Sequence, residues 1–333
     1  MNLALCTVAR RLAPFASAAL LCVAPARAED LANWNDGAAR QAIQAFVAAV
    51  TRPGPDYVAP EARIAVFDND GTLWSEQPIY TEFAFSFARA AEMAKADPKL
   101  AAKPAFAAAA SGDPRRITAV AEKDLLEMVV LTHSGVTTET FAAQVKAWLS
   151  QARDPRFKRP YDANVYAPML ELLSYLRANG FKTFIVSGGD TDFMRAFAGP
   201  VYGVPPDQVI GSASRTRFEQ KDGRWALVRM PEMTMDDQAA KPANIGLHIG
   251  ARPIFAAGNS DGDLQMLQYA SSGSGRRLAV LVHHDDAERE YAYDRASKVG
   301  RLDKALDEAA HSGWTVISMK RDWRTVFPQP SRP

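Results

Sequence analysis

The spacing of hydrophobic residues changes along the chain and divides it into parts. Helical spacing predicts one helix around Ala38–Val50 and a long helical stretch over Ile79–Leu149, in which Pro98 and Pro114 mark breaks. In the C-terminal half, helices alternate with short apolar runs that lack polar alternation, which is typical of buried parallel strands. The pattern therefore predicts a doubly wound parallel α/β sheet with helices inserted after its first strand.

Five apolar runs are the candidate strands of this sheet. They are Ile64–Asp68, Thr183–Ser187, Pro253–Ala257, Leu278–His283 and Thr315–Met319. Residues 209–230 are expected to form a β-hairpin, with its turn at Asp222-Gly223. Further helices are expected over 165–176, from about 261, and over 302–309. Ligands bind beyond the carboxyl ends of strands in such sheets, and three strands end at polar residues: Asp68, Ser187 and Asn259.

The first 28 residues have the pattern of a cleavable signal peptide. Arg10 and Arg11 precede an apolar run over Leu12–Val23, and small residues flank Arg27 at the expected cleavage site after Ala28. A membrane anchor is the alternative, but about a dozen residues are too few to cross ~30 Å of hydrocarbon. We therefore predict a periplasmic or secreted protein, without a membrane contact after cleavage.

Composition and charge narrow the possible partners and nucleophiles. The chain has 333 residues, is 47% hydrophobic, carries a net charge of +1 and contains two cysteines, a globular composition. The balanced charge gives no electrostatic reason to expect nucleic acid or a membrane surface. Signal cleavage would change the charge to −2 and remove Cys6 and Cys22, which excludes a thiol nucleophile, a thiolate metal site and a disulfide framework. The oligomeric state is not predictable from these counts.

An acidic turn directly after the first predicted strand is the first candidate for chemistry. In Asp68-Asn69-Asp70-Gly71-Thr72, two carboxylates two residues apart on a turn can face the same small volume. One carboxylate could then attack a substrate while the other transfers a proton. The alternative is an ordinary turn, because Asp, Asn and Gly are common turn residues.

Four motifs in order make the chain resemble the haloacid dehalogenase-like superfamily, whose members are mostly phosphatases. The first motif matches residues 66–74, the second Ser187, the third Lys241 and the fourth residues 258–263. The resemblance implies a Rossmann-like core with an α-helical cap. Within the superfamily, the chain is most similar to the phosphoserine-phosphatase-like members. We assign residues 1–28 to the signal peptide, 29–74 and 161–327 to the core, and 75–160 to the cap.

The resemblance also implies catalytic roles for individual residues. Asp68 would attack phosphorus and form an aspartyl phosphate, and Asp70 would protonate the leaving oxygen and then activate water. Lys241 would stabilise negative charge. The phosphate-binding residues expected beside it are Ser187, Gly188 and Thr72. Glu76, on the segment leading into the cap, could recognise a cationic group such as an amine, or could equally be a surface acid.

A Mg²⁺ ion is the cofactor that the resemblance implies. Its ligands would be the Asp68 carboxylate, the Asp70 backbone carbonyl and the fourth motif, through Asn259 and Asp263. The family usually has Asp where this chain has Asn259, and an amide brings no charge, so we expect weaker metal binding. Asp261 could substitute in part, or could cap the following helix.

The residues beside the nucleophile favour transfer of a phosphoryl group to water. The dehalogenase branch lacks an acid equivalent to Asp70, and the ATPase branch has lysine where this chain has Asn69. The prediction is a Mg²⁺-dependent phosphomonoester hydrolase that acts on a small organic phosphate. The alternatives are a phosphotransferase, and a non-catalytic binding protein for a phosphate ester, which the unusual Asn259 suggests.

Two further groups of residues are interpreted structurally. Adjacent side chains on a strand point to opposite faces, so His283 and His284 cannot easily bind one metal ion, and we expect a surface or loop role for them. Trp314 and Trp323 are expected to pack the C-terminal elements.

Overall fold

The computed structural model describes residues 31–328, so the predicted signal peptide lies outside the described residues. Its centre is an eight-stranded sheet in the order β4-β3-β2-β1-β5-β6-β7, with β8 also paired to β6. All pairs are parallel except β3–β4 and β6–β7. The strands are β1 (Ile64–Phe67), β2 (Lys182–Asp190), β3 (Val209–Lys221), β4 (Arg224–Thr234), β5 (Phe255–Gly258), β6 (Leu278–Asp285), β7 (Ala292–Tyr293) and β8 (Thr315–Ser318).

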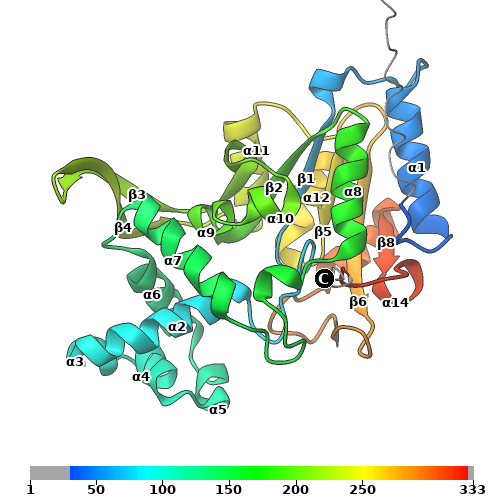
Figure 1. The fold of residues 1–333 in the computed structure, drawn as a ribbon. Coiled ribbons are helices and arrows are strands. Elements are labelled where there is room, and N and C mark those ends of the chain that lie inside the picture. Colours follow the sequence, from blue (N-terminus) through cyan, green and yellow to red (C-terminus); the bar gives the residue numbers. More distant parts are fainter. Residues whose placement is uncertain (1–30, 329–333) are drawn as a thin grey trace, which may run out of the picture.

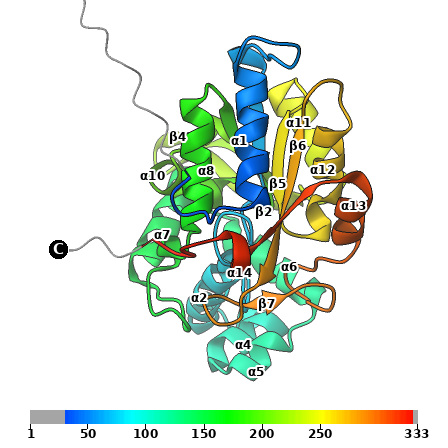
Figure 2. The same ribbon diagram turned by 90° about the vertical axis from the view of Figure 1, so that its right-hand side faces the viewer.

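Helices cover both faces of the sheet, because its central strands are apolar on both sides (Figure 2). One face packs against α1 (Ala38–Thr51) and α8 (Ala167–Ala178). The other packs against α11 (Ala240–Ile249), α12 (Leu264–Ser271) and α13 (Lys304–Ser312). Three short helices complete these layers: α9 (Thr191–Arg195), α10 (Ala198–Tyr202) and α14 (Met319–Asp322). Of the helices within residues 31–328, none combines the length and apolar character that crossing a membrane requires.

A group of helices follows β1 and stands apart from the sheet layers (Figure 1). Its members are α2 (Thr81–Ala96), α3 (Pro98–Ala101), α4 (Pro104–Ser111), α5 (Pro114–Thr118), α6 (Glu122–His133) and α7 (Thr138–Gln151). Part of this insert has its own apolar cluster, which includes Phe87, Phe106 and Met128. The β3–β4 hairpin pairs with it, since Gly135 N donates to Arg229 O and Arg229 N donates to Val136 O.

The structure confirms the doubly wound sheet, the five predicted strands and the hairpin turn between β3 and β4. The expected breaks at Pro98 and Pro114 both begin new helices, α3 and α5. The long helical stretch has further breaks that periodicity did not predict, after α3, α5 and α6. Trp314 and Trp323 are buried in the two sheet-facing cores, as expected.

Candidate active site

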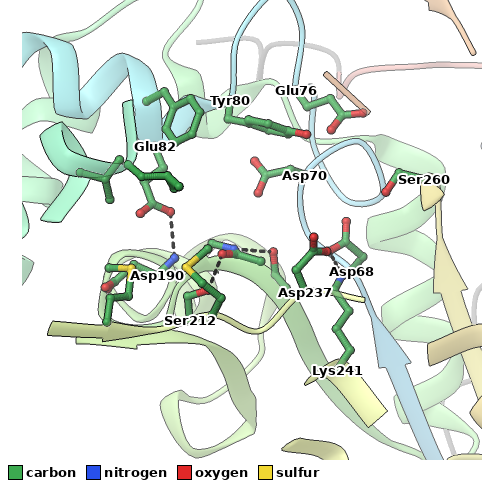
Figure 3. Close-up of a pocket in the computed structure, with 18 of the residues that line it drawn as sticks. Asp68, Asp70, Glu76, Tyr80, Glu82, Asp190, Ser212, Asp237, Lys241 and Ser260 are labelled. Carbon is green, nitrogen blue, oxygen red and sulfur yellow. Dashed lines mark hydrogen bonds and ion pairs between the residues drawn. The ribbon is translucent and has the colours of Figure 1, made fainter. Parts of the chain in front are cut away.

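A cavity of about 470 Å³ lies where the carboxyl ends of β1 and β2 face the helical insert (Figure 3). Because β2, β1 and β5 are neighbours in a parallel arrangement, the segments that follow them meet at one edge of the sheet. Asp68 follows β1 directly, Ser187 lies in β2 and Lys241 lies in the first turn of α11. Six of the predicted site residues line the cavity: Asp68, Asp70, Glu76, Ser187, Gly188 and Lys241.

Lys241 lies between two buried carboxylates at the floor of the cavity. Its Nζ donates to Asp68 Oδ1 at 2.7 Å and to Asp263 Oδ1 at 2.6 Å. The second oxygen of Asp263 accepts from the backbone N–H groups of Asn259 and Ser260. Both Asp263 oxygens are therefore occupied, and Asp263 fixes Lys241 and the loop after β5. This arrangement holds the ammonium against Asp68.

The two carboxylates of the acidic turn have raised pKa values. Burial raises the pKa of Asp68 to about 8; the charges of Asp263 and Asp70 add to this effect, and Lys241 opposes it. Burial raises the pKa of Asp70 to about 6, against a hydrogen bond from Trp74 Nε1 to its Oδ1 (2.8 Å). A pKa near 6 suits a side chain that both donates and accepts a proton near neutral pH.

The turn itself can be built only with glycine at position 71. Gly71 has φ +74°, and a Cβ there would lie 2.1 Å from Asn259 Nδ2 and 2.4 Å from Glu76 Oε1. Glu76 is 2% exposed, and its Oε1 accepts from Asn259 Nδ2 and from Tyr293 OH, both at 2.7 Å. Burial raises its pKa well above the ordinary value, despite the Tyr293 hydrogen bond. The surface alternative for Glu76 is therefore wrong.

Thr72 does not line the cavity, and its assignment to the phosphate-binding residues stays a prediction. Its side chain is fully buried, and its Oγ1 donates to Asn259 Oδ1 at 3.0 Å and lies 3.5 Å from Asp68 Oδ2. The hydroxyl thus connects the end of β1 with the end of β5. Thr72 orients Asp68 and Asn259 from behind the cavity.

His284 is buried, so the expected surface or loop role is wrong for it. Its Nε2 lies 2.7 Å from the Gly71 carbonyl oxygen and its Nδ1 lies 3.2 Å from Glu290 Oε2. Ser75 Oγ donates to Glu290 Oε1 at 2.6 Å. Burial alone would raise the pKa of Glu290, but the contacts with His284 and Ser75 lower it. This polar group contacts the backbone of the acidic turn through the Gly71 carbonyl.

The oxygen donors around Asp68 are of the chemical type that a hard divalent cation prefers. The carboxylates of Asp68 and Asp263 share one cation, Lys241. Burial, and then the charges of Asp263 and Asp70, raise the pKa of Asp68. No cluster of three or more His, Cys, Asp or Glu side chains in residues 31–328 is arranged to hold a metal ion. Carboxylate, carbonyl and amide oxygens are nevertheless the donors that Mg²⁺ prefers. Asp261 points elsewhere, because its Oδ1 accepts from the backbone N–H groups of Asp303 and Ala305.

Several cavity residues come from the insert and the hairpin and were not predicted. They are Tyr80, Glu82, Phe83, Glu122, Leu126, Val129 and Val130 from the insert, and Met233 and Met235 from the hairpin. Two of these residues are acids in the first turn of a helix, Glu122 in α6 and Glu82 in α2. The placement of Glu82 depends on how α2 packs against α6 and on its hydrogen bond with Asp190 N in β2.

The fold and the site define a class: a doubly wound α/β protein whose acidic groups meet at the strand ends beneath a helical insert. The sequence model of the haloacid dehalogenase-like hydrolases matches residues 65–268, which include all four motifs. The chain belongs to this family. No curated protein matches the sequence.

A solved structure with a TM-score above 0.5 shows the same fold at low sequence identity, and two further structures are less similar. A conserved protein of unknown function from Anaerococcus prevotii is 16% identical with a TM-score of 0.54, over 88% of this chain and 96% of its own. A protein of unknown function from Bordetella pertussis is 15% identical with a TM-score of 0.47, over 77% and 97%. A phosphoserine phosphohydrolase-like protein from Francisella tularensis is 16% identical with a TM-score of 0.38, over 75% and 98%.

Proposed function

We propose that the protein is a Mg²⁺-dependent phosphomonoester hydrolase acting on a small organic phosphate. The observation that supports this most strongly is that Asp68, Asp70, Ser187 and Lys241 line one cavity. Family membership supports hydrolysis, and the acid at position 70 supports water as the acceptor. The helices of residues 75–160 would act as a cap that excludes water from the cavity.

In the first step, a carboxylate oxygen of Asp68 would form a bond to phosphorus while the ester P–O bond breaks. Asp70 would give its proton to the departing alkoxide oxygen. Lys241 would offset the negative charge on Asp68 and the phosphoryl oxygens. The Ser187 hydroxyl and the Gly188 N–H would donate to those oxygens. The products of this step are the alcohol and an aspartyl phosphate.

In the second step, water would attack phosphorus and the bond between phosphorus and Asp68 would break. Asp70 would take the proton of the attacking water, so each residue returns to its starting state. The Asp68 carboxylate, the Asp70 carbonyl and Asn259 Oδ1 would hold Mg²⁺. Asp263 would lie next to this group, because Lys241 contacts both Asp263 and Asp68. The ion would supply positive charge that lets an anionic nucleophile approach an anionic ester.

Phosphate release by the purified protein tests the proposal. The wild-type chain should release phosphate from small monoesters with Mg²⁺, and a chelator should abolish release. Asp68→Asn keeps the shape of the side chain but removes the nucleophile, so release should fall by at least about a thousandfold. Equal rates in wild type and Asp68→Asn, or no effect of the chelator, would contradict the proposal.

The same assay separates the two alternatives. A phosphotransferase would convert the ester to a new phosphate ester when an alcohol acceptor is in excess, with little free phosphate. A binding protein would bind a phosphate ester without turnover.

We further propose that residues 1–28 direct export to the periplasm or the outside of the cell. N-terminal sequencing of protein recovered from an exporting host should begin at Glu29. A first residue of Met1 would contradict it.

A further inference from the structure

The charges that line the cavity are strongly one-sided. Among the described residues, Lys241 is its one basic lining residue, and its Nζ already contacts both Asp68 and Asp263. Seven acidic residues line the same cavity: Asp68, Asp70, Glu76, Glu82, Glu122, Asp190 and Asp237. A substrate with a carboxylate or a second phosphate would meet repulsion without a partner cation. The leaving group is therefore expected to carry no negative charge.

Most of these acids have other roles. Asp68 and Asp70 belong to the proposed chemistry, and Asp190 pairs with the buried guanidinium of Arg229. Glu76 accepts from Asn259 and Tyr293 behind the acidic turn. Glu122 and Asp237 are exposed, where solvent screens their charge. Glu82 is the remaining acid.

Glu82 approaches the proposed chemistry from the insert. It lies in the first turn of α2 and is 8% exposed. Glu82 and Asp70 both face Gly189. A Cβ added to Gly189 would lie 3.1 Å from Glu82 Oε2 and 3.7 Å from Asp70 Oδ2. Figure 3 shows Glu82 and Asp70 in the same cavity. A group only a few atoms from the ester oxygen that Asp70 protonates can therefore reach Glu82.

The charge of Glu82 has no lysine or arginine partner within residues 31–328. Its Oε2 accepts the backbone N–H of Asp190 at 2.8 Å. Its Oε1 lies 3.2 Å from His133 Nε2, which makes no hydrogen bond in this arrangement. A cationic ligand in the cavity would offset the negative charge of this carboxylate. A poorly solvated anion is stabilised most by a nearby cation.

Six apolar residues of the insert and the hairpin segment line the same cavity as Glu82. The residues of this apolar wall are Phe83, Leu126, Val129, Val130, Met233 and Met235. Aromatic faces and methionine side chains suit the alkyl groups of a substituted ammonium, and aromatic rings attract its charge. The cavity volume of about 470 Å³ leaves room for such substituents beside a phosphate.

We infer that the substrate is a phosphate monoester of an amino alcohol, with its ammonium at Glu82 and its alkyl groups on the apolar wall. This inference rests on the proposed phosphatase function. It names the substrate class and makes Glu82 the residue that determines specificity. Phosphate esters whose leaving group carries an anion are excluded by the same charges.

A panel of matched esters tests the inference. Phosphocholine has a close neutral isostere, 3,3-dimethylbutyl phosphate, and 3-phosphoglycerate supplies an anionic leaving group. With Mg²⁺, kcat/KM should be about 10- to 100-fold higher for phosphocholine than for the neutral isostere, the range of one charge-assisted contact. It should be lower still for 3-phosphoglycerate. Equal values for phosphocholine and the isostere would overturn the inference.

Substitution of Glu82 assigns the preference to that carboxylate. Glu82→Gln should lower kcat/KM for phosphocholine and bring the ratio between phosphocholine and the isostere to within about threefold of one. Glu92→Gln removes the same charge from the same helix at a side chain that is 72% exposed, and should leave the ratio unchanged. A Glu82→Gln variant that slows both esters equally would show a positioning role and overturn the inference.

A binding measurement separates failure of this inference from failure of the phosphatase proposal. Calorimetry would compare choline with 3,3-dimethylbutanol, each in the presence of inorganic phosphate, on wild type and Glu82→Gln. Glu82-dependent choline binding without turnover of any ester would support the cation site and contradict the phosphatase. Turnover of the esters without a preference for the cationic one would support the phosphatase and contradict the cation site. Absence of both turnover and binding would overturn both.

Discussion

The floor and the wall of the cavity are built in different ways. The floor consists of side chains that follow a strand or begin a helix, such as Asp68, Lys241 and Asp263, which are buried and joined by hydrogen bonds from Lys241. The wall consists of helix and hairpin side chains, of which Leu126 is 41% and Met235 50% exposed. Chemistry on a charged ester requires fixed groups in a poorly solvated site. Recognition of a leaving group requires an accessible surface, and the two demands are met by different parts of the chain.

Removing the cation of the floor should have the largest effect. Lys241→Met leaves Asp68 and Asp263 buried without their shared ammonium. We expect the free energy of unfolding to fall by about 3–5 kcal/mol, because an unpaired buried charge is costly. Phosphate release should fall by about a hundred- to thousandfold, the usual loss for one group that stabilises transition-state charge. Urea denaturation and a phosphate assay measure the two effects.

A second substitution checks that the loss of stability comes from the uncompensated carboxylates. Adding Asp263→Asn to Lys241→Met removes one of the two buried charges, so part of the lost stability should return. Activity should not return, since Lys241 is still absent. A double variant that is less stable than Lys241→Met would show that the cost arises from packing instead of charge.

A medium effect on stability is expected from substituting Asp70, and its size depends on pH. Burial raises its pKa from the ordinary 3.8 to about 6, so the folded chain binds this proton more tightly than the unfolded chain. Its contribution to stability is therefore complete below about pH 4 and is lost as pH rises through 6. In chelator at pH 7, Asp70→Asn should be more stable than wild type by roughly 1–3 kcal/mol. At pH 4 the difference should vanish.

Added Mg²⁺ provides the control for this prediction. A divalent cation beside the turn favours the ionised carboxylate, so Mg²⁺ should stabilise wild type more than Asp70→Asn and reduce the difference at pH 7. Wild type that is more stable than Asp70→Asn at pH 7 in chelator would contradict the raised pKa. Activity should be absent in the variant under all conditions.

The floor was predictable from the sequence because short motifs encode it. Asp68, Ser187 and Asn259 end or follow apolar runs, and parallel pairing of β2, β1 and β5 brings such positions together. Lys241 followed from the family resemblance at the start of a helix. The floor therefore depends on local pattern and on one rule of sheet topology.

The wall and the support behind the turn were not predictable, because they depend on contacts between distant segments. Glu82 reaches the cavity only through the packing of α2 against α6 and its hydrogen bond with the backbone of Asp190. His284 is buried because Glu290 and the Gly71 carbonyl satisfy its ring nitrogens. A histidine at a strand end carries no local signal of such partners. Single polar residues are therefore where sequence reasoning fails in this chain.

The smallest effect on stability is expected at the wall, where Leu126 tests whether recognition is separate from the floor. Leu126→Ala shortens a side chain that is 41% exposed and lines the cavity, so the free energy of unfolding should change by less than about 1 kcal/mol. The floor remains intact, so kcat should stay within about twofold of wild type. KM should rise by about 2- to 10-fold for an ester with a bulky apolar leaving group, because roughly one to two buried methylene contacts are lost. KM for a minimal ester such as methyl phosphate, which does not reach the wall, should not change. An equal rise for both esters would show that the wall acts on the floor, and that the two parts of the cavity are not independent.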